Sequence, residues 1–172
     1  MPSRGLVVSI QANALNLALV AHSARHALEQ YSSVSTDLMF ERFPRGACGA
    51  TSELIGRYLS EVYQLRGKLV SGLKSDGSTH IWLSFHGIIL DITADQFGQS
   101  AVIVSRKSAW HEAWETGEDE HPDAHQVDWP TYLEPAWQAL VAGLVRANFQ
   151  SPASATVVAE TIAPSVPQVI SG

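Results

Sequence analysis

Three residue types that together can activate a thiol follow one another in this chain. Cys48 lies between Gly46 and Gly49, directly before an amphipathic pattern that is typical of a helix. His80 opens a strand pattern, and Asp91 lies in the next strand pattern. A thiolate is a nucleophile, an imidazole can accept and return its proton, and a carboxylate can orient that imidazole. This order predicts a cysteine nucleophile with a histidine base.

The position of Cys48 favours the charged form of its thiol. A free thiol has a pKa of about 8.5 and is mostly protonated at neutral pH. Cys48 would occupy the first turn of a helix, where unpaired N–H groups favour negative charge. An imidazolium at His80 would add to this effect. Gly46 and Gly49 let a substrate approach the backbone, and the N–H of Cys48 is a candidate donor to an oxyanion.

The segment 79–93 predicts a hairpin that brings the histidine and the aspartate together. A two-residue turn at His86-Gly87 puts six apolar side chains on one face: Ile81, Leu83, Phe85, Ile88, Leu90 and Ile92. The other face carries His80, Trp82, Ser84, Ile89, Asp91 and Thr93. In this register Trp82 pairs with Asp91 and His80 with Thr93, because a one-residue slip would mix the two faces. His80 and Asp91 are then diagonal neighbours, roughly 7 Å apart at the backbone.

Hydrophobic periodicity predicts the other elements and an α+β fold. We expect helices at 13–31, 48–65, 108–116 and 131–147, and strands at 68–74, 79–85, 88–93 and 102–105. The run 92–97 that follows Asp91 also reads as extended. Residues 1–148 are expected to form one domain, and residues 149–172, rich in Pro, Ser, Ala and Val, a flexible tail.

Composition narrows the classes of protein and partner. The chain has 172 residues, 45% hydrophobic and 16% charged, which suits one globular domain. Its net charge of −6, without a cluster of Lys and Arg, makes nucleic acid an unsuitable partner. One cysteine cannot form an internal disulfide, so we expect a reducing compartment, the cytoplasm. No run is long enough to span a membrane, and Gln11, Asn13 and Asn16 interrupt the N-terminal apolar stretch, which favours a helix over a signal peptide.

With these residues in place, the chain resembles the papain-like and transglutaminase-like cysteine enzymes. That superfamily carries Cys at a helix N-terminus, then His and Asp or Asn on consecutive strands. The segments 46–52, 80–83 and 87–91 are similar to its nucleophile helix, His–Trp strand and acidic strand. Small leader-cleaving proteases of lasso-peptide pathways and papain-fold domains of bacterial toxins and effectors share this outline. The resemblance covers residues 44–98 and implies a nucleophile helix packed on a small antiparallel sheet.

One residue departs from the papain pattern. Papain has a Gln six residues before its nucleophile for the oxyanion hole, and this chain has Arg42 there. Gln11 or Gln96 would substitute only if the fold brought them close. Gln96 and Trp82 are candidates for the walls of the site.

The resemblance implies a thiol-dependent hydrolase or acyltransferase that acts on amide bonds of a protein or peptide. Peptidase, deamidase and transglutaminase reactions stay open, as does the oligomeric state. We expect no cofactor and no metal. The alternative is an inactive papain-like fold that serves as a protein-binding module, with an inert Cys48 and a Trp-rich, acidic C-terminal half as its contact surface.

Other polar and aromatic groups favour simpler interpretations. His22 and His26 share a helical face, but no third metal ligand is evident, so we expect solvent-facing histidines. His111, His121 and His125 lie among acidic residues and are expected in a solvated loop. The tryptophans of this half are expected in the core or in a packed interface: Trp110, Trp114, Trp129 and Trp137.

Overall fold

The computed structural model of the protein describes residues 4–116 and 130–150. Within these residues the chain has an α+β fold, with four α-helices and an antiparallel five-stranded sheet. The helices are α1 (Arg4–Val34), α2 (Cys48–Tyr63), α3 (Ala109–Glu112) and α4 (Glu134–Gln150), with two 3₁₀ helices, η1 (Ala94–Phe97) and η2 (Thr131–Leu133). The strands are β1 (Lys68–Leu73), β2 (Thr79–Phe85), β3 (Ile88–Asp91), β4 (Ile103–Ser105) and β5 (Glu115–Thr116), in the order β4-β3-β2-β1-β5. No helix in the described part of the chain is long and apolar enough to cross a membrane.

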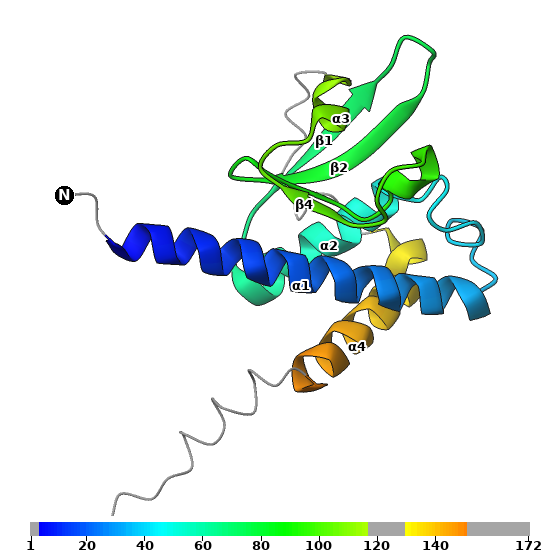
Figure 1. Cartoon of the computed structure of the whole chain (residues 1–172). Coiled ribbons are helices and arrows are strands. Elements are labelled where there is room, and N and C mark those ends of the chain that lie inside the picture. The colour runs from blue at the N-terminus through cyan, green and yellow to red at the C-terminus, as the bar shows by residue number, and fades with distance from the viewer. Residues whose placement is uncertain (1–3, 117–129, 151–172) are drawn as a thin grey trace, which may run out of the picture.

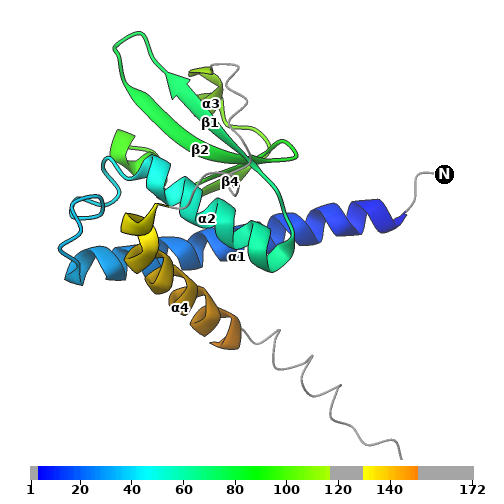
Figure 2. The same ribbon diagram turned by 180° about the vertical axis from the view of Figure 1, so that it is seen from behind.

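The helices α1, α2 and α4 lie on one side of the sheet, and α1 and α4 cross beneath it (Figure 1). From behind, α2 runs between the sheet and α4 (Figure 2). The short helix α3 lies near the C-terminal end of β1, away from the crossing of α1 and α4. The expected arrangement of a helix on a small antiparallel sheet is therefore confirmed.

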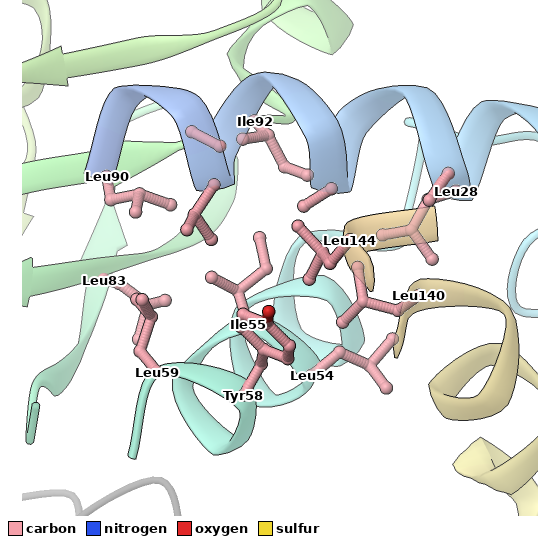
Figure 3. Close-up of a cluster of buried hydrophobic side chains, with 14 of the residues drawn as sticks. Leu28, Leu54, Ile55, Tyr58, Leu59, Leu83, Leu90, Ile92, Leu140 and Leu144 are labelled. Carbon is pink, nitrogen blue, oxygen red and sulfur yellow. The ribbon is translucent and has the colours of Figure 1, made fainter. Parts of the chain in front are cut away.

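A single hydrophobic core joins these helices to the sheet. Leu54, Ile55 and Leu59 form the buried stripe of α2, as the amphipathic pattern predicts. They meet Leu83 and Leu90 from the sheet, and side chains from α1 and α4 close the other side (Figure 3). The apolar face of the hairpin thus packs on the helices, and its polar face points away from them.

The predicted register of the hairpin is confirmed at its closed end. Phe85 pairs with Ile88 and Leu83 with Leu90. The turn has two residues with positive φ, 49° at His86 and 78° at Gly87, as a type I′ turn requires. The ladder stops at Leu83–Leu90, short of the pairs expected further along. The chain leaves the sheet after Asp91 because residues 94–97 form η1, so the prediction of an extended run at 92–97 is wrong.

Several other boundaries differ from the sequence-based prediction. The first helix begins at Arg4 rather than at residue 13. The helix expected at 108–116 ends at Glu112, because Glu115 and Thr116 pair with β1 as a strand. The last helix continues to Gln150, so the prediction of a tail is wrong for residues 149 and 150, and the rest of the predicted tail lies outside the described residues.

Candidate active site

Cys48, His80 and Asp91 come together, as the sequence predicts. The His80 ring is fully buried, and its Nε2 lies 2.6 Å from Oδ2 of Asp91. Its other nitrogen, Nδ1, has no hydrogen-bond partner among the described residues, and Cys48 lies beside the ring, close enough for the thiol and the imidazole to shift each other's pKa. Hydrogen bonds between a nucleophile and its base are often long or poorly aligned before a substrate binds.

The early end of the β2–β3 ladder gives Cys48 access to His80. Ile81 would be the next residue to pair across the hairpin on the apolar face, but β3 has ended. Its N–H instead acts on the Cys48 thiol and lowers the thiol's pKa, and its carbonyl accepts from Ser52 Oγ at 3.4 Å. The first turns of α2 therefore occupy the edge of β2 that the third strand leaves open. The thiol reaches the imidazole through this opening.

The surroundings of Cys48 favour a thiolate beside an imidazolium. Burial raises the pKa of the Cys48 thiol and is the largest single effect. His80 and the backbone N–H groups of Ile81 and Gly49 together outweigh burial, so the pKa of the thiol lies below its ordinary value. Burial lowers the pKa of His80, but hydrogen bonds to Asp91 and Cys48 raise it to about 9. Each group of the pair thus stabilises the charge of the other.

Asp91 is held by a second histidine that the sequence-based prediction missed. His111 Nε2 lies 3.1 Å from Asp91 Oδ2, and its Nδ1 lies 2.8 Å from Oγ of Ser108. The other carboxylate oxygen accepts from the backbone N–H and the hydroxyl of Thr93. Burial raises the pKa of Asp91, but the hydrogen bonds from His111 and His80 hold it well below its usual range. Asp91 is therefore a buried carboxylate that stays charged.

The placement of His111 corrects an expectation. It was expected in a solvated loop, but it is 3% exposed and belongs to the site. The other two histidines of that group, His121 and His125, lie outside the described residues. The serine three residues before His111 is the N-cap of α3, and this capping pattern was the available sequence signal. His80, Asp91 and His111 are residues of the types that bind metal ions. Both imidazole rings contact Oδ2 of Asp91 directly, so we interpret the three residues as a hydrogen-bonded cluster.

An aromatic layer covers the face of the sheet that carries His80. Four rings lie within 5.2–5.7 Å of the His80 ring, centre to centre: Trp82, Phe97, Trp110 and Trp114. Gly72, opposite His80 on β1, leaves room for them, because a Cβ there would lie 2.8 Å from the Trp82 ring. The layer excludes water from the His80–Asp91 bond.

The remaining predicted residues occupy two different places. Trp82 is buried behind His80 and is not among the residues that line the pocket at Cys48. Gln96 accepts from the Gly46 N–H at 3.3 Å, and its amide donates to the Thr93 carbonyl. Gln96 thus ties the loop before Cys48 to the segment after Asp91. Gln11 belongs to the part of α1 whose side chains are not described.

Arg25 fixes the segment that follows Asp91. This α1 residue donates to the Ile92 carbonyl at 2.7 Å and forms two bonds with the Asp95 carboxylate, at 2.7 and 2.8 Å. Its contact with a residue so distant in sequence explains why sequence reasoning missed it. Arg25 holds η1, and η1 in turn carries the ring of Phe97 to His80.

A pocket of about 570 Å³ opens beside Cys48. It is lined by Cys48, Ser71, Gly72, Leu73, Thr79, His80, Ile81, Glu115 and Thr116. Cys48 is partly exposed, so the thiol is accessible while its base is buried. This combination suits a nucleophile that meets substrate from one side and a proton acceptor from the other.

The other histidines and tryptophans singled out in the sequence do not line this pocket. His22 and His26 are exposed on α1, as expected, and line a separate hollow against α4. Trp114 and Trp137 are buried, which agrees with core packing and removes both from an exposed contact surface. Trp129 lies outside the described residues. No family model, curated protein or solved structure matches the chain.

Proposed function

We propose that the protein is a thiol-dependent hydrolase or acyltransferase that acts on amide bonds, with a fold similar to papain-like and transglutaminase-like enzymes. The observation that carries this proposal is that Cys48 and His80 line one pocket, while His80 Nε2 lies 2.6 Å from Oδ2 of Asp91. The lowered pKa of the Cys48 thiol and the raised pKa of His80 support it, because the nucleophile is the thiolate.

The proposed reaction has two steps. The thiolate of Cys48 attacks the amide carbonyl, the C–N bond breaks, and the leaving amine takes the proton of His80. The resulting thioester is then attacked by water or by an amine, which gives its proton to His80, and the thiolate leaves. Asp91 orients His80 and stabilises its charged form throughout.

The N-terminus of α2 is the proposed site of the oxyanion. The first N–H groups of a helix have no intrahelical acceptor and favour negative charge. Gln96 does not line the pocket at Cys48, and its side chain bonds to the Gly46 N–H and the Thr93 carbonyl. We therefore assign this role to backbone groups at Cys48. A protein or peptide is the proposed substrate, and a single unpaired cysteine suits a reaction in the cytoplasm.

The pH dependence of Cys48 alkylation tests the proposal. Because Cys48 is the only cysteine, mass spectrometry of the iodoacetamide adduct reports on this thiol alone. We expect the folded protein to react rapidly below pH 7, whereas the same protein unfolded in urea should react with a midpoint of about 8.5. Equal profiles for the folded and unfolded chains would contradict the proposal and favour an inactive binding module.

An activity-based probe extends this test to amide chemistry. A peptide vinyl sulfone should label the folded wild-type protein, and Cys48→Ala should show no labelling. Labelled or processed partners can then be identified by proteomics. Amidase activity that survives in Cys48→Ala would overturn the mechanism.

A further inference from the structure

The strand register places three pocket residues on one face of the sheet. Leu73 of β1 pairs with Thr79 of β2 on one side and with Glu115 of β5 on the other. Directly paired residues of antiparallel strands project from the same face. Ser71 pairs with Ile81 two residues further along, so it shares this face. The pocket therefore extends from Cys48 across β2 and β1 to Glu115 on β5.

Apart from the proposed catalytic pair, Glu115 is the one charged side chain among the described residues that line this pocket. Glu115 is exposed, and its carboxylate makes no hydrogen bond or ion pair with another described residue. Lys74, the next residue after β1, forms no ion pair with Glu115, and its ammonium lies 4.3 Å from the centre of the Trp114 ring. Among the described residues, the far end of the pocket is thus a carboxylate without an ion-pair partner.

Between Cys48 and Glu115 the walls are apolar or carry hydroxyls. Leu73 is 48% exposed although it is apolar, and Ile81 lines the floor near the thiol. Thr79 adds a hydroxyl oxygen that can accept hydrogen bonds. Apolar walls that end in a carboxylate complement a side chain with an aliphatic stem and a cationic head.

We propose that this pocket receives a lysine or arginine side chain of the substrate, with its stem against Leu73 and its cation at Glu115. This inference rests on the proposed function, because it assigns the substrate preference of that site. The ion pair would be partly open to solvent, so a preference of about three- to fivefold over a neutral side chain of equal length is expected.

Peptidyl acyloxymethyl ketones that alkylate Cys48 provide the probe. Each peptide carries Lys, norleucine or Glu at one of the two positions nearest the reactive group, and alanine elsewhere. Norleucine matches the stem of lysine without its charge. The rate of Cys48 modification is measured by mass spectrometry in the wild type, Glu115→Gln and Glu115→Lys. Glu112→Gln is the matched control, because Glu112 is an exposed glutamate of the same segment that does not line the pocket.

At one of the two positions the wild type and Glu112→Gln should react faster with Lys than with norleucine, and slowest with Glu. Glu115→Gln should react equally with Lys and norleucine, and Glu115→Lys should favour Glu. A Lys preference that is absent in the wild type, or unchanged in Glu115→Gln, would overturn the inference. Iodoacetamide separates this result from failure of the proposed function. If iodoacetamide reacts rapidly with Cys48 below pH 7 but the probes show no Lys preference, only the inference about the pocket is overturned. If Cys48 reacts like an ordinary thiol, both this inference and the proposed function are overturned.

Discussion

Asp91 makes four hydrogen bonds, two through each carboxylate oxygen, although its side chain is almost completely buried. A buried carboxylate without such donors would take up a proton instead of keeping its charge. Thr93 supplies both donors to one oxygen, so the other is free to face His80 and His111. The charge that holds the His80 imidazole is therefore secured by Thr93 and His111, neither of which lines the pocket at Cys48.

Replacing this charge tests how Asp91 acts on Cys48. In Asp91→Asn the side chain keeps a similar shape, but His80 loses the charge that raises its pKa. The imidazolium then stabilises the thiolate less, and the midpoint of Cys48 alkylation should rise by about 1 pH unit. Asp76→Asn, in the exposed turn between β1 and β2, is the control and should leave the midpoint unchanged. An unaltered profile in Asp91→Asn would show that Asp91 has only a structural role.

At the scale of elements, local patterns and distant contacts contribute different parts of the site. The helix that begins at Cys48 and the hairpin turn at His86-Gly87 follow from periodicity and turn chemistry within a few residues. The sequence thus predicts the Cys48–His80–Asp91 set and the polar face that carries the last two. These predictions needed no knowledge of the rest of the chain.

The second layer of the site could not be predicted in this way. Strand β5 has only two residues and forms because it pairs with the end of β1. A two-residue strand is too short for hydrophobic periodicity to predict it. His111 and Trp114 reach His80 and Asp91 only through that pairing and the turn of α3. Arg25 bonds to Asp95 although 70 residues separate the two in the sequence. Each of these contacts depends on tertiary packing, which overrides local preference.

A substitution at Gly72 tests how closely the rings of the aromatic layer pack against β1. Alanine there would place a Cβ 2.8 Å from the Trp82 ring and 3.0 Å from the Cβ of Trp114, so the rings must shift. We expect Gly72→Ala to destabilise the fold by about 1–3 kcal/mol and to slow Cys48 alkylation, since His80 loses its support. Urea denaturation monitored by tryptophan fluorescence measures the stability. Leu73→Ala on the same strand should change it by only about 0.5 kcal/mol because Leu73 is half exposed, and an equally mild Gly72→Ala would refute the packing argument.

At the scale of the whole molecule, the titration of Cys48 and His80 makes the free energy of unfolding depend on pH. The pKa of His80 is raised from 6.5 to about 9 by folding, so its stabilisation is complete below pH 6.5 and is lost as the pH rises through about 9. The pKa of Cys48 is lowered from 9.0, so its contribution grows over the same alkaline range. The two dependences have opposite signs, so the thiol offsets part of the loss that comes from His80 in the wild type. The stability of the intact protein should therefore vary less between pH 6.5 and 9 than the titration of His80 alone would require.

Removing the thiol should expose the contribution of His80 alone. In Cys48→Ala, Asp91 still favours the imidazolium in the folded state, but no thiolate appears to compensate as the pH rises. We expect the free energy of unfolding of this variant to fall by about 1–2 kcal/mol more than that of the wild type between pH 6.5 and 9. Urea denaturation at several pH values measures both curves. The double variant Cys48→Ala, His80→Gln should lose the slope again, because the titrating imidazole is gone. Parallel curves for Cys48→Ala and the wild type would mean that the thiol and the imidazole do not share a proton.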